Sequence, residues 1–311
     1  SRHAWRYDIG GYAWANTELA PNNWLWYSFL RTGRADIFRM AEAMTRHTGD
    51  VDVYHIGPMK GLGTRHNVSH WGCGAKEARI GQAAWKRFHY YLTTDERSGD
   101  LMREALEVEK AMMELEPLRI AQPKEQFPYG GPTRLRWGPD WLALAGNWLT
   151  EWERSGDTRY RDKIREGLNS LMRLPDGLFT GTGGLSYDPA TGRMWYDGRE
   201  GATNKNHLST IMGGFELLTE LEDMLEHPFF KKTLVEYGTY YSMPGDDPRR
   251  NTTNRRWGDI GFLNPRMTGY AAAALNDPDL AARAWREFLN PRSGSRERFP
   301  QLYSGSPVTP P

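Results

Sequence analysis

Five helical pairs repeat along this sequence, and the repetition constrains the fold more than any other feature. Each pair consists of an apolar, aromatic-rich helix, a short polar turn and a more highly charged amphipathic helix. Units of this kind recur at intervals of roughly fifty to seventy residues, a period typical of stacked helical hairpins. We place the pairs at residues 24–44, 76–113, 140–174, 207–241 and 267–289.

The predicted turns use residues that end one helix and begin the next. Gly33 and Gly156 suit the left-handed conformation of a helix C-cap. Thr94 and Asp157 are typical N-cap residues, and Pro278 fits the first turn of a helix. Within the third pair, apolar residues recur at i, i+3, i+4, i+7 and i+8, the spacing of one helical face: Trp141, Leu144, Ala145, Trp148 and Leu149.

The repeat predicts an all-α fold, an α/α toroid of helical hairpins with the more apolar helix of each pair on the inside. Five hairpins are one short of a six-hairpin ring. Residues 177–199 are rich in turn signals and predict a small β-hairpin. We expect residues 1–311 to form a single toroid domain. Because the chain opens at Ser1 without a methionine, we interpret it as a piece of a larger multidomain protein.

The composition excludes several classes of binding partner and site. Lysine and arginine number 40 against 39 acidic residues, which argues against nucleic-acid and anionic-membrane partners. No apolar run reaches the length of a membrane span. The single cysteine, Cys73, excludes an internal disulfide and a cysteine-based zinc site. The 13 tryptophans and 15 tyrosines fill part of the core and also suit a cleft that stacks on sugar rings.

Residues 54–72 carry an unusual density of titratable side chains between glycines. The segment includes His55, His66 and His70. Two histidines four residues apart share one helical face and could bind a metal. The positions between them, Asn67 to Ser69, lack the glutamate of a zinc-protease motif, so a metal is the weaker interpretation. The structural alternative is that His70 packs beside Trp71 and bonds a backbone carbonyl.

Four further segments that lead into the first helix of a pair join Asn or Arg to an aromatic or histidine side chain. Arginine can bind a carboxylate with two hydrogen bonds while an aromatic ring stacks on a sugar. Helix capping above a packed aromatic ring is the structural alternative for each segment. The four segments are residues 21–26, 134–140, 198–207 and 254–259.

The first third of the chain carries a family resemblance. The pairs Asn23-Trp24 and Tyr54-His55, and the run from Arg65 through Asn67 and His70 to Trp71, resemble the C-terminal toroid of exo-rhamnogalacturonan lyases, polysaccharide lyase family 26, and their bacterial relatives. Those proteins have β-rich domains ahead of the toroid. The resemblance implies exo-acting β-elimination in rhamnogalacturonan I, an acidic glycan, and packing against such β-rich domains.

β-Elimination at a uronic acid requires a group that neutralises the carboxylate, a base for the C5 proton and an acid for the leaving oxygen. We predict Arg65 as the neutralising group, His66 as the base, and His70 or Tyr54 as the acid. The remaining expected contacts are substrate-binding residues: Asn23, Trp24, His55, Asn67, Trp71, Trp137, Glu200, Asn206, His207, Arg256 and Trp257. We expect no cofactor, and the sequence does not indicate a calcium ion.

Two alternatives remain open at this stage. A hydrolase acting on uronic-acid oligosaccharides would need two carboxylates, for which Glu77, Asp140, Glu200 and Asp259 are candidates. A toroid that binds glycans without catalysis would keep the aromatic cleft and lack the chemistry. The sequence leaves the compartment open between secreted, periplasmic and bacterial cytoplasmic locations.

Overall fold

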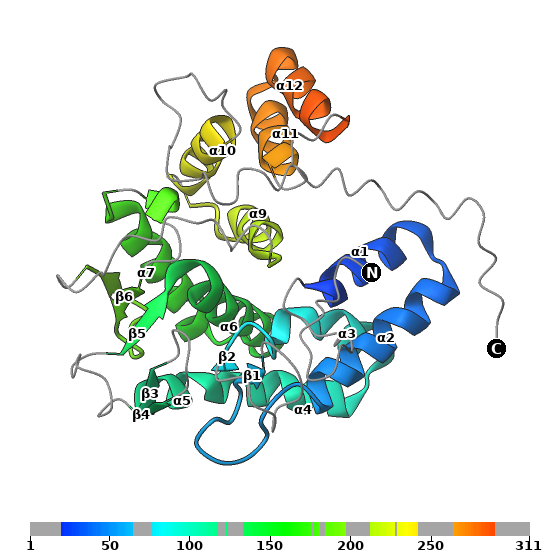
Figure 1. The fold of residues 1–311 in the computed structure, drawn as a ribbon, viewed down its shortest axis with the longest axis vertical. Coiled ribbons are helices and arrows are strands. Elements are labelled where there is room, and N and C mark those ends of the chain that lie inside the picture. Colours follow the sequence, from blue (N-terminus) through cyan, green and yellow to red (C-terminus); the bar gives the residue numbers. More distant parts are fainter. Residues whose placement is uncertain are drawn as a thin grey trace, which may run out of the picture. The chain divides into compact units, whose positions relative to one another are not determined.

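The computed structural model describes residues 20–64, 76–116, 122–123, 133–175, 177–180, 184–196, 212–227, 229–241 and 264–289. These residues fall into two compact units, Ser1–Lys231 and Lys232–Pro311, each of which is treated by itself. Figure 1 shows the helices in chain order, with helical pairs predominating throughout.

The three helical pairs of the first unit match the predicted pairs closely. Helices α1 and α2 pack together, as do α3 and α4, and α6 and α7. The turns between them are those that the sequence predicts. The bounds are α1 Pro21–Thr32, α2 Ala35–Asp50, α3 Arg87–Thr93, α4 Glu96–Glu104, α6 Leu142–Ser155 and α7 Thr158–Arg173.

Short helices complete these pairs. A 3-10 turn, η2 (Ala83–Trp85), precedes α3, and α4 continues through η3 (Ala105–Glu107) into α5 (Val108–Glu114). A π-helical turn, η5 (Trp137–Trp141), leads into α6, and η6 (Gly177–Thr180) follows α7. Helix α9 (Gly214–Leu225) ends the first unit, and α10 (Phe230–Tyr241) crosses into the second.

The helix caps confirm most of the predicted turn chemistry. Gly33 and Gly156 are left-handed C-caps, and the Asp157 carboxylate accepts a hydrogen bond from the backbone N–H of Arg159. The prediction for Thr94 is wrong, because Thr94 is the left-handed C-cap of α3. The neighbouring Asp95 is the N-cap of α4, since its carboxylate accepts from the N–H of Ser98. A carboxylate at this position favours the helix N-terminus more strongly than a threonine hydroxyl.

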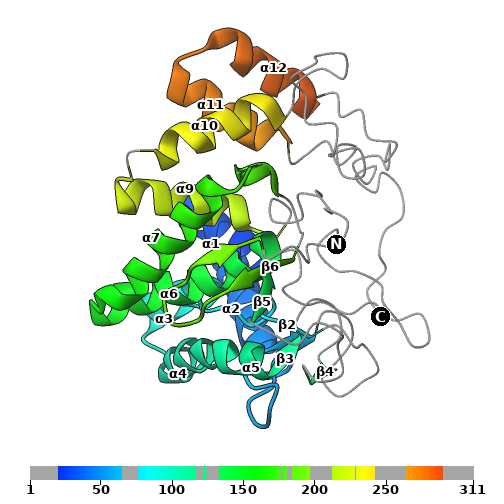
Figure 2. The ribbon, with the colours of Figure 1, turned by 90° about the vertical axis from the view of Figure 1, so that its left-hand side faces the viewer.

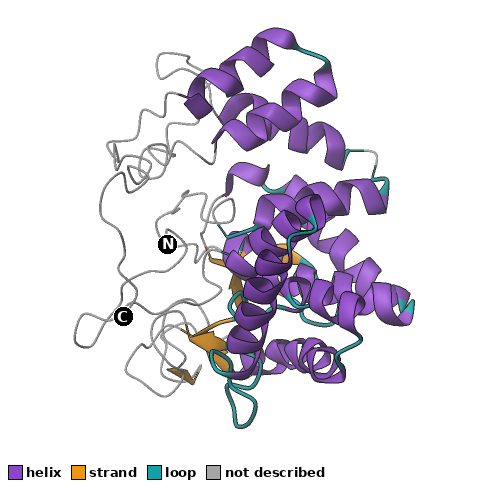
Figure 3. Ribbon diagram, turned by 90° about the vertical axis from the view of Figure 1, so that its right-hand side faces the viewer, coloured by secondary structure: helices purple, strands orange, loops and turns teal. Residues whose placement is uncertain are grey.

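The strands are few and short. The predicted β-hairpin within residues 177–199 forms, as β6 (Gly184–Tyr187) and β7 (Met194–Trp195). It gains a third antiparallel strand, β5 (Arg134–Arg136), which the sequence interpretation treats as a loop. Two further pairs are β1 (Gly63–Thr64) with β2 (Lys76–Glu77) and β3 (Leu115–Glu116) with β4 (Gln122–Pro123). Figures 2 and 3 show these strands gathered at one edge of the first unit's helices.

Helix α6 forms the centre of the first unit. Its residues from Leu142 to Thr150 are all buried, whereas α7 buries one stripe that includes Ile164, Leu168 and Leu171. The first helix of this pair is therefore the more deeply buried, as the sequence predicts. Asn147 fixes its neighbours, because its side-chain oxygen accepts from the N–H of Ala83 (2.7 Å) and its amide donates to the carbonyl of Ala105 (2.9 Å).

The second unit contains a packed helical pair, α11 (Asn264–Leu275) and α12 (Pro278–Leu289). Pro278 is the first residue of α12, as predicted. Ala271, Ala272 and Leu280 form its buried cluster. In neither unit is a described helix long and apolar enough to cross a membrane.

Candidate functional site

Strands β1 and β2 pair the residues on either side of positions 65–75, which include His66 and His70. Gly63 pairs with Glu77, and Thr64 pairs with Lys76, in antiparallel register. Residues 65–75 connect these two strands, so the segment predicted to carry the base begins and ends at one point of the fold. That point lies directly before η2 and α3 in the chain.

The segment before β1 is a tight turn. Val53 forms a bridge to Gly63, the N–H of Tyr54 donates to the carbonyl of Leu62 (3.0 Å), and the N–H of Gly61 donates to the carbonyl of Tyr54 (2.9 Å). Gly61 has a φ of 86°, and a Cβ at this position would lie 2.9 Å from the backbone nitrogen of Val108. Only glycine satisfies both the positive φ and the close approach to α5.

Four charged side chains, of which three are buried and Arg136 is 11% exposed, join β2 to the start of α6. Glu77 and Asp140 have no exposed surface. Arg79 pairs with Glu77, and Arg136 lies 3.6 Å from Glu77 and 2.7 Å from Asp140. Burial lowers the pKa of Arg136, but the carboxylates of Asp140 and Glu77 outweigh it and hold the pKa above the usual arginine value. We call Glu77, Arg79, Arg136 and Asp140 the Arg136 network.

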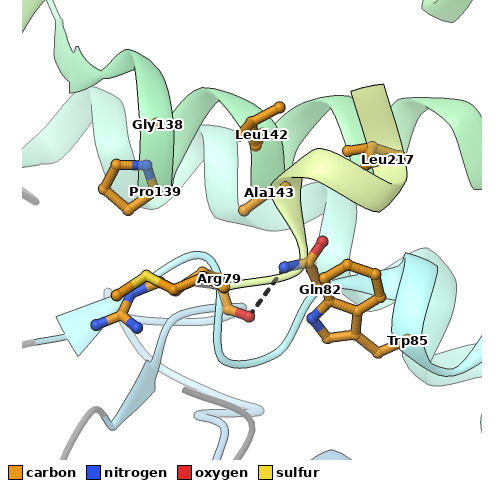
Figure 4. Close-up of a pocket in the computed structure, with 10 residues that line it drawn as sticks. Arg79, Gln82, Trp85, Gly138, Pro139, Leu142, Ala143 and Leu217 are labelled. Atoms are coloured by element: carbon orange, nitrogen blue, oxygen red, sulfur yellow. Dashed lines mark hydrogen bonds between the residues drawn. The ribbon is translucent and has the colours of Figure 1, made fainter. Parts of the chain in front are cut away.

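A small pocket lies beside this network, where η2, η5 and α9 meet α6. Figure 4 shows Gln82 donating to the carbonyl of Arg79 (3.2 Å) with Trp85 close by. The pocket has room for about one water molecule, so it is too narrow for a sugar ring. Its lining residues are Arg79, Gln82, Trp85, Gly138, Pro139, Leu142, Ala143, Met212, Gly214 and Leu217.

Tyr54 and His55 are the described members of the predicted catalytic segment. Both lie in the turn that leads to β1, and burial raises the pKa of the Tyr54 phenol. A phenol is protonated at neutral pH without any shift, and a raised pKa makes it a weaker acid. Nδ1 of His55 lies 2.6 Å from the Glu104 carboxylate, and Nε2 lies 3.2 Å from the carbonyl of Asp50. Both nitrogens of His55 are thus engaged within the protein.

The other described candidates differ in accessibility. Trp24 is 55% exposed on α1, so its ring offers a surface to a ligand. Asn23 is buried on the same helix, and its side-chain oxygen has no hydrogen-bond partner within the described structure. Trp137 is 1% exposed and packs 6.4 Å from Trp141, so it presents no open face in this structure. Substrate binding by these residues stays a prediction.

The remaining predicted site residues lie outside the described residues. They are Arg65, His66, Asn67, His70, Trp71, Glu200, Asn206, His207, Arg256 and Trp257. Among the residues that are described, there is no group of three or more His, Cys, Asp or Glu side chains that could hold a metal ion.

The structure brings together a second charged cluster that the sequence interpretation missed. Arg87 of α3 is buried, donates to both carboxylate oxygens of Glu220 on α9 (2.6 and 2.5 Å) and lies 3.4 Å from Glu153 on α6. Burial raises the pKa of Glu153, and Arg87 partly opposes that rise. The three residues are far apart in sequence and lie on predicted helices, so no local pattern marks them.

Comparison with known proteins identifies the family of this chain. Residues 1–305 match the model of the PcRGLX-like protein C-terminal alpha/alpha toroid domain. The chain belongs to this family. The match confirms the predicted α/α toroid and the predicted family, which is related to rhamnogalacturonan lyase.

One curated relative extends the comparison. The chain is 45% identical over 292 residues to the uncharacterized protein YetA of Bacillus subtilis. This alignment covers 93% of the chain and 33% of YetA, so the chain spans about a third of that relative's length. The activity of a whole protein of this kind is therefore a matter of proposal.

Proposed function

We propose that this toroid domain takes part in the cleavage of a uronic-acid-containing glycan of the rhamnogalacturonan I type by β-elimination, from a chain end. The observation that carries the proposal is membership of a lyase-related family over residues 1–305. In support, β1 and β2 pair the residues on either side of positions 65–75, which carry Arg65, His66 and His70.

The reaction needs no water. Arg65 would neutralise the uronate carboxylate and so acidify the C5 proton. His66 would remove that proton as the bond between C4 and the glycosidic oxygen breaks, which leaves a C4–C5 double bond. His70 or Tyr54 would protonate the departing oxygen. Of these four residues the structure describes Tyr54, which lies in the segment that leads to β1.

The remaining predicted contacts would hold the substrate. Exposed Trp24 provides a surface on which a sugar ring could stack. The proposed partners also include β-rich domains packed against the toroid, as the resemblance implies.

A hydrolase is less well supported. Two of its four candidate carboxylates, Glu77 and Asp140, are fully buried and paired with Arg136. Hydrolysis at a glycosidic bond needs carboxylates that reach the substrate and an attacking water. The other two, Glu200 and Asp259, lie outside the described residues.

The test is product formation from rhamnogalacturonan I oligosaccharides by the full-length protein. A lyase product carries the C4–C5 double bond and absorbs in the ultraviolet, whereas a hydrolase product has new reducing ends without that absorbance. His66→Ala should abolish the absorbance rise. His227→Ala is the matched control, because His227 contacts Asn169 (3.0 Å) near the end of α9 and is not a predicted site residue. Reducing ends without absorbance would favour a hydrolase, and binding without turnover would favour a non-catalytic toroid.

A further inference from the structure

Several helices of the first unit begin around the pocket shown in Figure 4. The turn η2 leads into α3, η5 leads into α6, and Gly214 is the first residue of α9; all three contribute residues to the lining. Trp85 of this lining also packs against Ala20, which directly precedes α1. A molecule bound in the pocket would therefore contact the segments where α3, α6 and α9 start.

The side-chain amide of Gln82 provides a hydrogen-bond acceptor in this pocket. Gln82 is 3% exposed, and its amide nitrogen donates to the carbonyl of Arg79 (3.2 Å). This bond determines which way the amide faces, because only its NH2 end can donate to a carbonyl. The amide oxygen therefore faces α6, where a Cβ on Gly146 would lie 2.8 Å from it. It has no hydrogen-bond partner within the described structure.

The indole of Trp85 provides a donor in the same pocket. Trp85 is 4% exposed, and its Nε1 has no hydrogen-bond partner among the described residues. The ring has little freedom to turn toward one, because a Cβ on Gly213 would lie 2.7 Å from Cη2 of the indole and Ala20 packs against the ring. Figure 4 shows the Gln82 amide and the Trp85 indole next to each other. A fixed acceptor and a fixed donor thus line one pocket.

The chemistry of these two atoms limits what the pocket can bind. Buried amide oxygens and indole N–H groups are costly to leave unpaired, and in folded proteins nearly all of them bond to protein or to ordered water. The pocket has room for about one water molecule, and a buried water needs at least two polar partners. A simple cation could serve only the oxygen of Gln82, and a simple anion only the N–H of Trp85. The pocket therefore requires a small neutral molecule that both donates and accepts.

We propose that Gln82 and Trp85 bind one resident water molecule in this pocket. The water donates to the amide oxygen of Gln82, accepts from Nε1 of Trp85 and fills the space between the segments that start α3, α6 and α9. It stabilises the fold by pairing two buried groups that are fixed in place by their neighbours. The inference concerns the folded domain and does not depend on the proposed function.

A crystal structure of the full-length protein, at a resolution that shows ordered water, is the first test. We expect one isolated density peak in the pocket, within about 3.2 Å of both Oε1 of Gln82 and Nε1 of Trp85. A pocket without density, a larger ligand in it, or a protein group bonded to either atom would overturn the proposal.

The second test detects the water in solution, with Trp141 as the matched control. Trp141 is also fully buried and its Nε1 has no partner within the described structure, but this atom lies so close to Gly167 that a Cβ there would overlap it. The two indole N–H signals of the full-length protein, made with isotope-labelled tryptophan, are identified by their loss in Trp85→Phe and Trp141→Phe. We expect a nuclear Overhauser cross-peak with water for Trp85 and none for Trp141. No cross-peak at Trp85, or equal cross-peaks at both, would contradict a water held specifically by this pocket.

Discussion

Asp140 accepts three hydrogen bonds from Arg136: one from its backbone N–H (2.9 Å) and two from its guanidinium (2.8 and 2.7 Å). The three residues between Arg136 and Asp140 are thereby closed into a turn. Because Asp140 is fully buried, this carboxylate depends on Arg136 for its compensation.

Arg136→Met should destabilise the protein by about 3–5 kcal/mol, because it leaves the buried Asp140 carboxylate with only a backbone N–H. Glu77 keeps Arg79 and contributes less to the loss. Urea denaturation measures the change. Arg159→Met serves as the control, since Arg159 pairs with Asp157 at a highly exposed position and its loss should have no measurable effect. A loss below about 1 kcal/mol in Arg136→Met would contradict the dependence of Asp140 on this arginine.

Lys86 should make stability depend on alkaline pH. Burial lowers the pKa of Lys86 to about 8, against a partial opposing effect of Glu104, Asp50 and Asp52. In the unfolded chain a lysine has a pKa of about 10.4. The folded protein binds this proton more weakly than the unfolded chain does. Protonated Lys86 therefore lowers the free energy of unfolding by its full amount below pH 8, and this destabilisation disappears as the pH rises to about 10.4. The titration of Lys86 therefore destabilises the folded state less at pH 10 than at pH 7.

The measurement compares wild type with Lys86→Met by urea denaturation from pH 7 to pH 10. The stability of wild type relative to the variant should rise by about 2–3 kcal/mol over this range. Lys110→Met, at an exposed position, corrects for the loss of one lysine charge from the chain. A difference that stays constant with pH would show that Lys86 keeps an ordinary affinity for its proton despite its burial.

The helical pairs could be predicted from sequence because their signals are local. Apolar periodicity and the glycines at positions 33 and 156 determine where α1, α6 and their partners lie. Strand β5 could not be predicted, because residues 134–136 become a strand only through pairing with β6, about fifty residues away. The sequence predicts Thr94 as the N-cap where the structure has Asp95, because both residue types can cap a helix and the two are adjacent.

The candidate site likewise has features that the sequence predicts and features that only the tertiary structure shows. The density of histidines in residues 54–72 is visible in the sequence, and so is each member of the Arg136 network. The pairing of Glu77 with Arg136, and of Arg87 with Glu220, depends on tertiary packing across 59 and 133 residues. Sequence interpretation treats Glu77 and Asp140 as candidate catalytic carboxylates, whereas their complete burial favours a structural use.

Gly61 should tolerate substitution less well than Gly156, although both have positive φ angles (86° and 72°). A Cβ on Gly156 has open space, so Gly156→Ala should cost about 1 kcal/mol from backbone strain alone. In Gly61→Ala the methyl group also meets the backbone of Val108, which raises the expected cost to about 2–4 kcal/mol. Thermal and urea denaturation compare the two variants, and equal losses would mean that α5 moves away without cost. Because Tyr54 is hydrogen-bonded to Gly61 in the same turn, Gly61→Ala should also lower any activity that depends on Tyr54.

Asn147 should be required for the packing of α6 against the residues that lead into α3 and α5. Asn147→Leu keeps a similar side-chain volume but leaves the N–H of Ala83 without its partner in the core and removes one of the hydrogen bonds to the carbonyl of Ala105, which keeps the N–H of Val108. An unsatisfied buried group costs about 1–3 kcal/mol, so we expect a loss of about that size in urea denaturation. Asn169→Leu is the control, because Asn169 is partly exposed and its side-chain oxygen contacts His227 near the surface. If both leucine variants lost the same stability, the cost would come from placing an apolar side chain in a helix and not from the two broken bonds. A larger loss in Asn147→Leu would show that a polar side chain inside the toroid core holds three separate elements in register.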